Sequence, residues 1–128
     1  MASPRNIYMG PRSCYASHEG IYVEGSGVGV DEAAGIATLI LRDLRRGWGY
    51  DRGCRRITID PVRAIQRLRY LIPLATKHRG SAEAERVKQL VEYVIETGTI
   101  PSWARPRIAY TYPVPQPVQK KRRAVAVA

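Results

Sequence analysis

The residues best suited to chemistry in this sequence are arginines without acidic neighbours. Residues 61–80 contain five cations and no carboxylate. An arginine guanidinium is a planar fork that can hold a phosphate through two hydrogen bonds at once. A merely solvated helix face usually interleaves both signs of charge, as residues 81–97 do. We therefore predict contacts to phosphate groups in and just before this segment. The predicted phosphate-binding residues here are Arg55, Arg56, Arg63, Arg67, Arg69, Lys77 and Arg79.

A second basic segment lies near the C-terminus. Four adjacent cations follow a proline-rich stretch, from which they could reach a neighbouring polyanion. These further predicted phosphate-binding residues are Lys120, Lys121, Arg122 and Arg123. A disordered, solubilising end is the alternative interpretation. Across the chain, 17 arginines and 4 lysines outnumber 11 acids, so the net charge is +10. This excess favours a polyanionic partner, although many charges and a single asparagine also fit a hot habitat.

No arrangement typical of an active site stands out. Most acidic residues occupy the starts of predicted helices, as Asp31, Asp60, Glu83 and Glu85 do. No carboxylate pair suggests general acid–base chemistry or a two-metal centre. We therefore predict that the protein is not an enzyme and uses no cofactor.

The cysteines and histidines do not form a recognisable metal-binding pattern. Cys14, His18, Cys54 and His78 are suitable zinc ligands by type, but their spacing matches no compact zinc finger. We predict no metal site. The two cysteines allow one disulfide at most. They would stay reduced in an ordinary cytosol and could bridge inside a hyperthermophilic archaeon, so the sequence leaves this open.

A glycine run, Gly25-x-Gly27-x-Gly29, precedes the first predicted helix. It lacks the full dinucleotide-binding pattern and the lysine of a P-loop. Asp31 and Glu32 would also repel a phosphate at this helix start. We interpret the run as a flexible hinge.

Three amphipathic helices are expected to position the cations. The first begins with Asp31 as its N-cap and ends before Gly47. The second has Asp60 as N-cap and runs to residue 79, with Pro73 expected to kink or divide it. The third covers residues 81–97, with Ser81 as its cap. Short extended pieces are expected at residues 21–24 and 56–59.

The predicted fold class is therefore all-α, a small helical body of about three main helices. We expect an extended N-terminal arm at residues 1–30, a helical DNA-binding body at 31–104 and a Pro-rich basic tail at 105–128. The arm has few large aliphatic residues with which to bury itself, so we expect it to bridge subunits. No apolar run reaches the roughly 18 residues of a membrane span.

A helix-turn-helix reader of base sequence fits these features poorly. Its recognition helix would cover residues 82–97, which are net acidic and offer only Arg86 and Lys88 as cations. Binding through phosphates, without regard to base order, suits the chain better.

The chain resembles the major capsid proteins of filamentous viruses of hyperthermophilic archaea. It is most similar to the tristromavirus type, as in Pyrobaculum and Thermoproteus filamentous viruses. The resemblance lies in small size, strong basicity and the Tyr/Gly/Pro-rich stretch from Tyr8 to Gly29. The arginine-bearing helix from Asp60 to Arg79 and the basic end Lys120–Arg123 also fit.

This resemblance implies a structural virion protein that packages linear double-stranded DNA, held in A-form, in a helical filamentous nucleocapsid. It implies a heterodimer with a second, related capsid protein, contacts with neighbouring capsid subunits and a lipid envelope around the filament. The protein would then be located in the virion, and in the host cytoplasm during assembly.

Two other classes of protein share some of these features. An archaeal chromatin-like or ribosome-associated nucleic-acid-binding module would be equally basic, but it would form discrete complexes rather than filaments. A small nuclease would need a carboxylate or metal cluster and would turn over DNA with added Mg²⁺.

Overall fold

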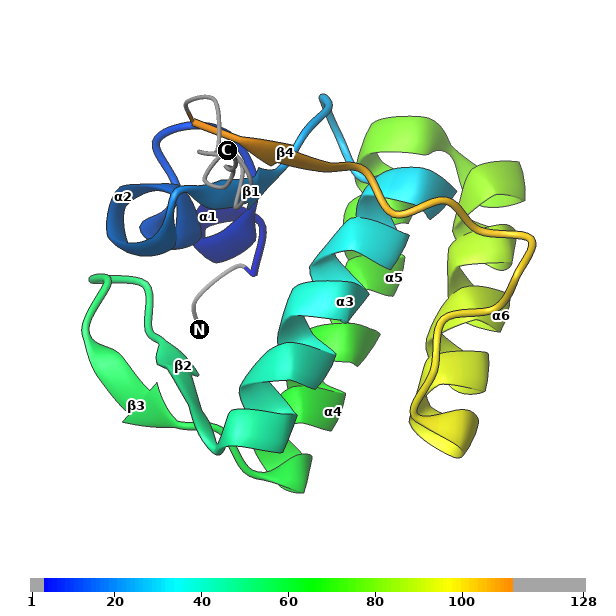
Figure 1. The fold of residues 1–128 in the computed structure, drawn as a ribbon. Helices are drawn as coiled ribbons and strands as arrows, with labels where there is room; N and C mark the ends of the chain where they lie inside the picture. The colour runs from blue at the N-terminus through cyan, green and yellow to red at the C-terminus, as the bar shows by residue number, and fades with distance from the viewer. Residues whose placement is uncertain (1–3, 112–128) are drawn as a thin grey trace, which may run out of the picture.

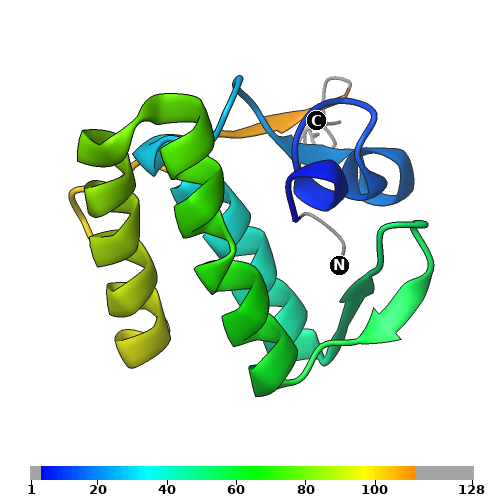
Figure 2. The same ribbon diagram turned by 180° about the vertical axis from the view of Figure 1, so that it is seen from behind.

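The computed structural model describes residues 4–111. In chain order the helices and strands are α1 (Pro4–Tyr8), α2 (Cys14–Glu19), β1 (Ile21–Val23), α3 (Val30–Arg46), β2 (Trp48–Tyr50), β3 (Arg56–Thr58), α4 (Pro61–Arg69), α5 (Leu71–Arg79), α6 (Ser81–Thr97) and β4 (Ile108–Tyr110). The long helix α3 packs against α4 and α6, and α5 packs against α6 (Figure 1). Seen from behind, α4 and α5 run in front of α3 (Figure 2).

The prediction of an all-α fold is wrong, because the helices are accompanied by two small antiparallel sheets. Strand β1 pairs with β4, with Val23 opposite Ile108. Strands β2 and β3 form a hairpin, with Trp48 opposite Thr58. The fold is therefore a small mixed α/β domain. Three-residue strands are too short to give a clear alternating pattern, and the partner of β1 lies far along the chain.

The predicted extended N-terminal arm is also wrong. Residues 4–23 form α1, α2 and β1, and they pack into the core. Ile7, Tyr8 and Tyr15 are completely buried, and the two tyrosine rings stack with their centroids 5.2 Å apart. This segment was expected to lack apolar surface because it has few aliphatic residues. Its tyrosines supply that surface instead, since a buried aromatic ring contributes a large apolar area.

The Pro-rich tail predicted to begin at residue 105 is wrong in its first part. Residues 108–110 form β4, and the backbone N–H of Glu24 donates to the carbonyl of Arg107 at 2.8 Å. The rest of the predicted tail, with Lys120, Lys121, Arg122 and Arg123, lies outside the described residues.

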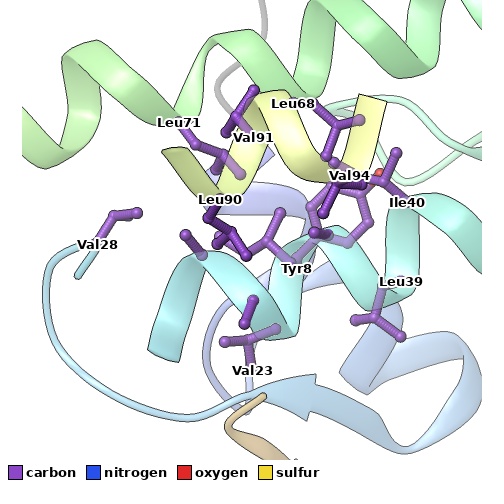
Figure 3. Close-up of a cluster of buried hydrophobic side chains, with 14 of the residues drawn as sticks. Tyr8, Val23, Val28, Leu39, Ile40, Leu68, Leu71, Leu90, Val91 and Val94 are labelled. Atoms are coloured by element: carbon purple, nitrogen blue, oxygen red, sulfur yellow. The ribbon is translucent and has the colours of Figure 1, made fainter. Parts of the chain in front are cut away.

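The core lies where α3 meets α4, α5 and α6 (Figure 3). Its labelled residues come from most parts of the fold: Tyr8, Val23, Val28, Leu39, Ile40, Leu68, Leu71, Leu90, Val91 and Val94. These side chains are almost fully excluded from solvent. Burial of apolar surface contributes about 25 cal/mol per Å², so this cluster holds α3 against the other helices.

Local signals placed several helix ends correctly. Asp60 is confirmed as the N-cap of α4, with its Oδ1 accepting the N–H of Arg63 at 2.8 Å. Gly47 and Gly98 end α3 and α6 in the left-handed conformation. Two predicted caps are displaced: Gly29 rather than Asp31 precedes α3, and Gly80 rather than Ser81 precedes α6.

The predicted second helix is divided at Tyr70, three residues before Pro73. Proline has no N–H to donate to the residue four positions earlier, and its ring crowds that carbonyl. The position of the break therefore matches the proline.

We predict that Gly35→Ala destabilises the protein, although alanine is the better helix former. An added Cβ would lie 2.9 Å from Cγ1 of Val23 and 3.2 Å from the backbone N of Arg107. Both neighbours belong to the paired segments around β1 and β4, so they cannot easily retreat. We expect the free energy of unfolding to fall by about 1–3 kcal/mol, as for other overpacked sites. Urea denaturation measures this, with Gln89→Ala on exposed α6 as control; a Gly35→Ala variant as stable as the wild type would contradict the prediction.

Candidate nucleic-acid interface

The predicted phosphate-binding residues divide into exposed and internally bonded side chains. Arg55, Arg56, Arg63, Arg69 and Lys77 are exposed. Arg55 forms an ion pair with Asp51 at 3.5 Å, yet its side chain remains 82% exposed. Such a pair is worth little and yields readily to a phosphate. These five side chains are accessible to a polyanion.

Arg67 is half-buried and engaged inside the subunit. Its Nη1 donates to the hydroxyl of Tyr8 at 3.0 Å, and its guanidinium carbon lies 5.9 Å from the centroid of that ring. The contact joins α4 to α1. Arg67 was predicted to bind phosphate because it lies in the acid-free segment 61–80, but only the packing of α1 could reveal its partner.

Arg79 is also bonded within the protein. Its Nη2 donates to Glu32 at 3.2 Å and to the carbonyl of Ser26 at 2.9 Å. These contacts attach the end of α5 to the glycine-rich loop before α3. The loop that we interpreted as a hinge is therefore packed against α5, and Gly27 and Gly29 within it are buried.

Arg69 lies on a different side of α4 from Arg63 and Arg67. It borders a groove of about 470 Å³ together with Ile72, Val91, Ile95 and two acids of α6, Glu92 and Glu96. The sequence indicated almost no acids near this arginine. The packing of α6 brings two of them to the same groove, which reduces the attraction of Arg69 for a phosphate.

Exposed arginines are carried by three elements that follow one another in the chain. The end of α3, the base of the β2–β3 hairpin and the start of α4 lie at one end of the molecule, whereas the hairpin turn extends toward α2, to which the Cys14–Cys54 disulfide joins it (Figure 1). We call this set of arginines the hairpin surface, and its members are Arg45 on α3, Arg52 and Arg55 in the hairpin turn, Arg56 on β3 and Arg63 on α4. Arg45 and Arg52 were not predicted as site residues. Arg45 lies in the last turn of α3, where a cation complements the helix dipole, and Arg52 follows Asp51 in the sequence, so neither gave a distinct signal.

One member of the hairpin surface, Arg56, lies over an aromatic ring. The guanidinium carbons of Arg46 and Arg56 lie 3.5 and 3.7 Å from the centroid of the Trp48 ring. Cation–π contacts of this kind are worth about 0.5–2 kcal/mol. Arg56 is therefore positioned by its neighbour in the hairpin while its side chain remains exposed.

Asp43 is at the centre of a buried polar network beneath this surface. Its carboxylate accepts the hydroxyl of Tyr8 at 3.1 Å and a guanidinium N–H of Arg46 at 3.3 Å. Burial raises the pKa of Asp43 to about 7, against the opposing effects of the Tyr8 hydrogen bond and of Arg46 and Arg67. Burial also raises the pKa of Tyr8, and the negative charge of Asp43 adds to this effect.

Glu19 is the second carboxylate of the network. It accepts Arg46 Nη2 at 2.9 Å and the Tyr50 hydroxyl at 2.7 Å, and it pairs with Arg42 at 2.8 Å. Burial acts to raise the pKa of Glu19, but these hydrogen bonds and the charges of the two arginines outweigh it and lower that pKa. The network joins α2 to α3 and β2, so its charges serve the internal structure.

Cys14 and Cys54 form a disulfide that joins α2 to the hairpin. His18 lies beside the bridge, with Nε2 2.9 Å from the carbonyl oxygen of Cys54, and its ring stacks on Tyr50. His78 is at another site, where its Nε2 lies 2.7 Å from Arg5 Nη1. Three of the four residues considered as zinc ligands therefore lie close together, but both cysteines are used in the disulfide and His78 is elsewhere. Within residues 4–111 no three His, Cys, Asp or Glu residues are grouped to hold a metal.

In the described part of the chain, no helix combines the length and the apolarity needed to cross a membrane. Comparisons with protein-family models, curated proteins and solved structures found no match to this chain.

Proposed function

We propose that this protein binds nucleic acid through its phosphates, without reading base order, and packages linear double-stranded DNA. The observation that carries the proposal is the hairpin surface, where five exposed arginines accompany only two acids, Asp51 and Asp60. Both acids are engaged with the backbone: Asp51 accepts the N–H groups of Gly53 and Arg55, and Asp60 caps α4. The guanidinium groups therefore dominate the local potential.

The distribution of acids elsewhere supports the same function. Residues 4–111 contain 17 cations and 11 acids. Three of these acids, Glu19, Glu32 and Asp43, are largely buried and bonded to arginines within the protein. Because these three acids engage three arginines, the other residues of this part of the chain still have six more cations than acids. Such an excess suits the closely spaced charges of a duplex, whose phosphates dominate binding energy without specifying sequence.

We further propose that the protein acts as a structural virion protein in a helical filamentous nucleocapsid, with a related capsid protein as heterodimer partner, neighbouring subunits around it, DNA in A-form and an envelope outside. This part rests on the resemblance. Several large apolar side chains are exposed on the surface and could contact neighbouring subunits: Val62, Tyr93, Trp103 and Tyr110. Residues 4–23 are packed in their own subunit, so bridging by an extended N-terminal arm is not part of the proposal.

We predict that removing arginines from the hairpin surface flattens the salt dependence of DNA binding. Each phosphate contact contributes about 0.9 to the slope of log K against log salt for duplex DNA. The triple variant Arg52→Gln, Arg55→Gln, Arg63→Gln should therefore lower the slope by about 3. Fluorescence anisotropy with a mixed-sequence duplex at several salt concentrations measures this.

Three single variants sharpen the test. Arg63→Gln should lower the slope by about 1, whereas Lys88→Gln, which removes one exposed charge from α6, should leave it unchanged. Arg67→Gln should affect stability rather than the slope, since its guanidinium already binds Tyr8. An unchanged slope in the triple variant would remove the hairpin surface from the interface.

Electron microscopy of the full chain with linear duplex DNA tests the packaging part separately. Regular filaments are expected. Discrete complexes that bind DNA with the same salt dependence would instead favour a chromatin-like or ribosome-associated module and would overturn the virion assignment.

A further inference from the structure

A second basic site lies on the other side of the fold from the hairpin. An open pocket of about 360 Å³ is lined by the start of α3, the end of α5, the start of α6 and the segment 103–107. Four arginines and a tryptophan line it: Arg79, Arg86, Trp103, Arg105 and Arg107. Its volume is at the lower end of the range for small-molecule sites, which begins at about 300 Å³.

Three acids also line the pocket, but each already accepts hydrogen bonds. Glu32 accepts the N–H of Gly29 at 3.2 Å and a guanidinium N–H of Arg79 at 3.2 Å. Glu83 accepts the N–H of Val30 at 2.9 Å, so it occupies the start of α3. These hydrogen bonds hold the walls of the pocket in place, and the four arginines that line the pocket outnumber its three carboxylates by one.

Asp31 fixes the segment that forms the remaining wall. Its Oδ1 accepts the backbone N–H of Arg105 at 3.2 Å, and its carbonyl accepts the backbone N–H of Arg107 at 3.3 Å. The side chain of Arg107 lies 3.9 Å from Glu24 in an exposed ion pair. Among the described residues, no carboxylate lies within ion-pair distance of the guanidinium of Arg86 or Arg105.

Trp103 adds a feature that a simple anion site does not need. Its side chain is 44% exposed, and the guanidinium carbon of Arg86 lies 5.4 Å from its ring centroid. An exposed indole beside unpaired guanidiniums is the combination with which proteins stack a base while holding its phosphate. The ring offers a flat apolar face, and the arginines offer donors.

We propose that this pocket binds a nucleoside phosphate, with the phosphate held by Arg86 and Arg105 and the base stacked on Trp103. The site shares no residue with the hairpin surface, so it does not depend on the proposed duplex binding. The ligand could be a free nucleotide or the phosphorylated end of a single strand, which present the same chemistry to these residues.

Titration of the full-length protein with adenosine 5′-monophosphate tests the assignment. Stacking should quench tryptophan fluorescence, and binding should raise the melting temperature. Trp103→Leu should abolish the quenching, because Trp48 is already enclosed by two arginines. Arg86→Gln should weaken binding at least tenfold, and Arg105→Gln provides a second variant should Arg86→Gln fail to fold. Lys88→Gln, an exposed position of α6, should bind as the wild type does.

Several results would overturn the proposal. The first is that 10 mM nucleotide neither quenches the fluorescence nor raises the melting temperature. The second is that the fluorescence of Trp103→Leu is quenched as much as that of the wild type. The third is that inorganic phosphate raises the melting temperature as much as the nucleotide does at the same concentration. A 5′-phosphorylated single-stranded oligonucleotide that competes for the site would identify a strand end as the source of the phosphate, and one that fails to compete would identify a free nucleotide.

The two proposals fail in different ways. If the pocket binds no nucleotide, the salt dependence of duplex binding should still respond to the hairpin variants. If duplex binding fails, Trp103→Leu should still remove the nucleotide-induced quenching.

Discussion

Replacing Asp43 with alanine is expected to lower the free energy of unfolding by about 3–5 kcal/mol. The side chain of Asp43 has no solvent exposure and accepts hydrogen bonds from Tyr8 and Arg46. Alanine would leave the buried hydroxyl of Tyr8 without its acceptor, remove one of several acceptors of Arg46, and open a cavity beside them. Because this network joins α1 to α3, the N-terminal segment should loosen first. Urea denaturation at pH 5, below the raised pKa of Asp43, measures the loss, with Glu92→Ala on exposed α6 as control; a loss below 1 kcal/mol would contradict the prediction.

The titration of Asp43 gives this prediction a second readout. Its folded pKa is raised from the ordinary 3.8 to about 7, mainly by burial. The folded protein therefore holds this proton more tightly than the unfolded chain does. The resulting stability is fully present below about pH 4 and is lost as the pH rises through 7. The slope in this window is at most about 1.4 kcal/mol per pH unit.

Comparison with Asp43→Asn isolates this contribution. The difference in unfolding free energy between wild type and Asp43→Asn should change between pH 5 and 8, in the direction that makes the wild type relatively less stable at the higher pH. Glu19 acts in the opposite sense: its pKa is lowered, so its stabilisation is lost as the pH falls below its ordinary 4.5. A difference that stays constant from pH 5 to 8 would mean that Asp43 does not titrate there.

Breaking the Cys14–Cys54 disulfide is expected to have an effect of similar size, about 4 kcal/mol. The bridge closes a loop with a sequence separation of 40, and cross-linking a loop of this length restricts the unfolded chain. A loss of this size should lower the melting temperature by more than about 10 °C. We expect this drop in melting temperature both when the wild-type protein is reduced and in the double variant Cys14→Ser, Cys54→Ser.

Circular dichroism melts with and without reductant measure this effect. The double serine variant is the matched control, because its melting temperature should not respond to reductant. A wild-type protein whose melting temperature shifts by only a degree or two on full reduction would show that the bridge adds little to stability.

Local signals predicted the three long helical segments and several of their ends. Asp60, Gly47 and Gly98 act within one helical turn, through a side chain that accepts a backbone N–H or through a left-handed residue. Such effects depend only on residues close in the sequence, so they can be recognised without knowing the fold. The N-cap of α3 was predicted at Asp31, two residues too late, because Gly29 has no side chain that could be recognised as a cap.

The candidate interface was only partly predictable from sequence. Arg63 was correctly expected to be exposed, whereas Arg67 and Arg79 bond to Tyr8 and Glu32, which come from distant parts of the chain. A count of charges along the sequence cannot distinguish an exposed arginine from one that is bonded inside the protein. The partner of each guanidinium depends on which helices pack together.

By itself, then, the sequence determined where the main helices form and how strongly basic the protein is, because both follow from composition and from contacts within a few residues. Only the tertiary structure decided that residues 4–23 fold into the core, that β1 pairs with β4, that Cys14 meets Cys54 and which arginines face outward. These outcomes depend on contacts between residues far apart in sequence, where each segment has several competing partners. The native partners are selected because they bury the apolar surface and pair the polar groups of all these segments at the same time.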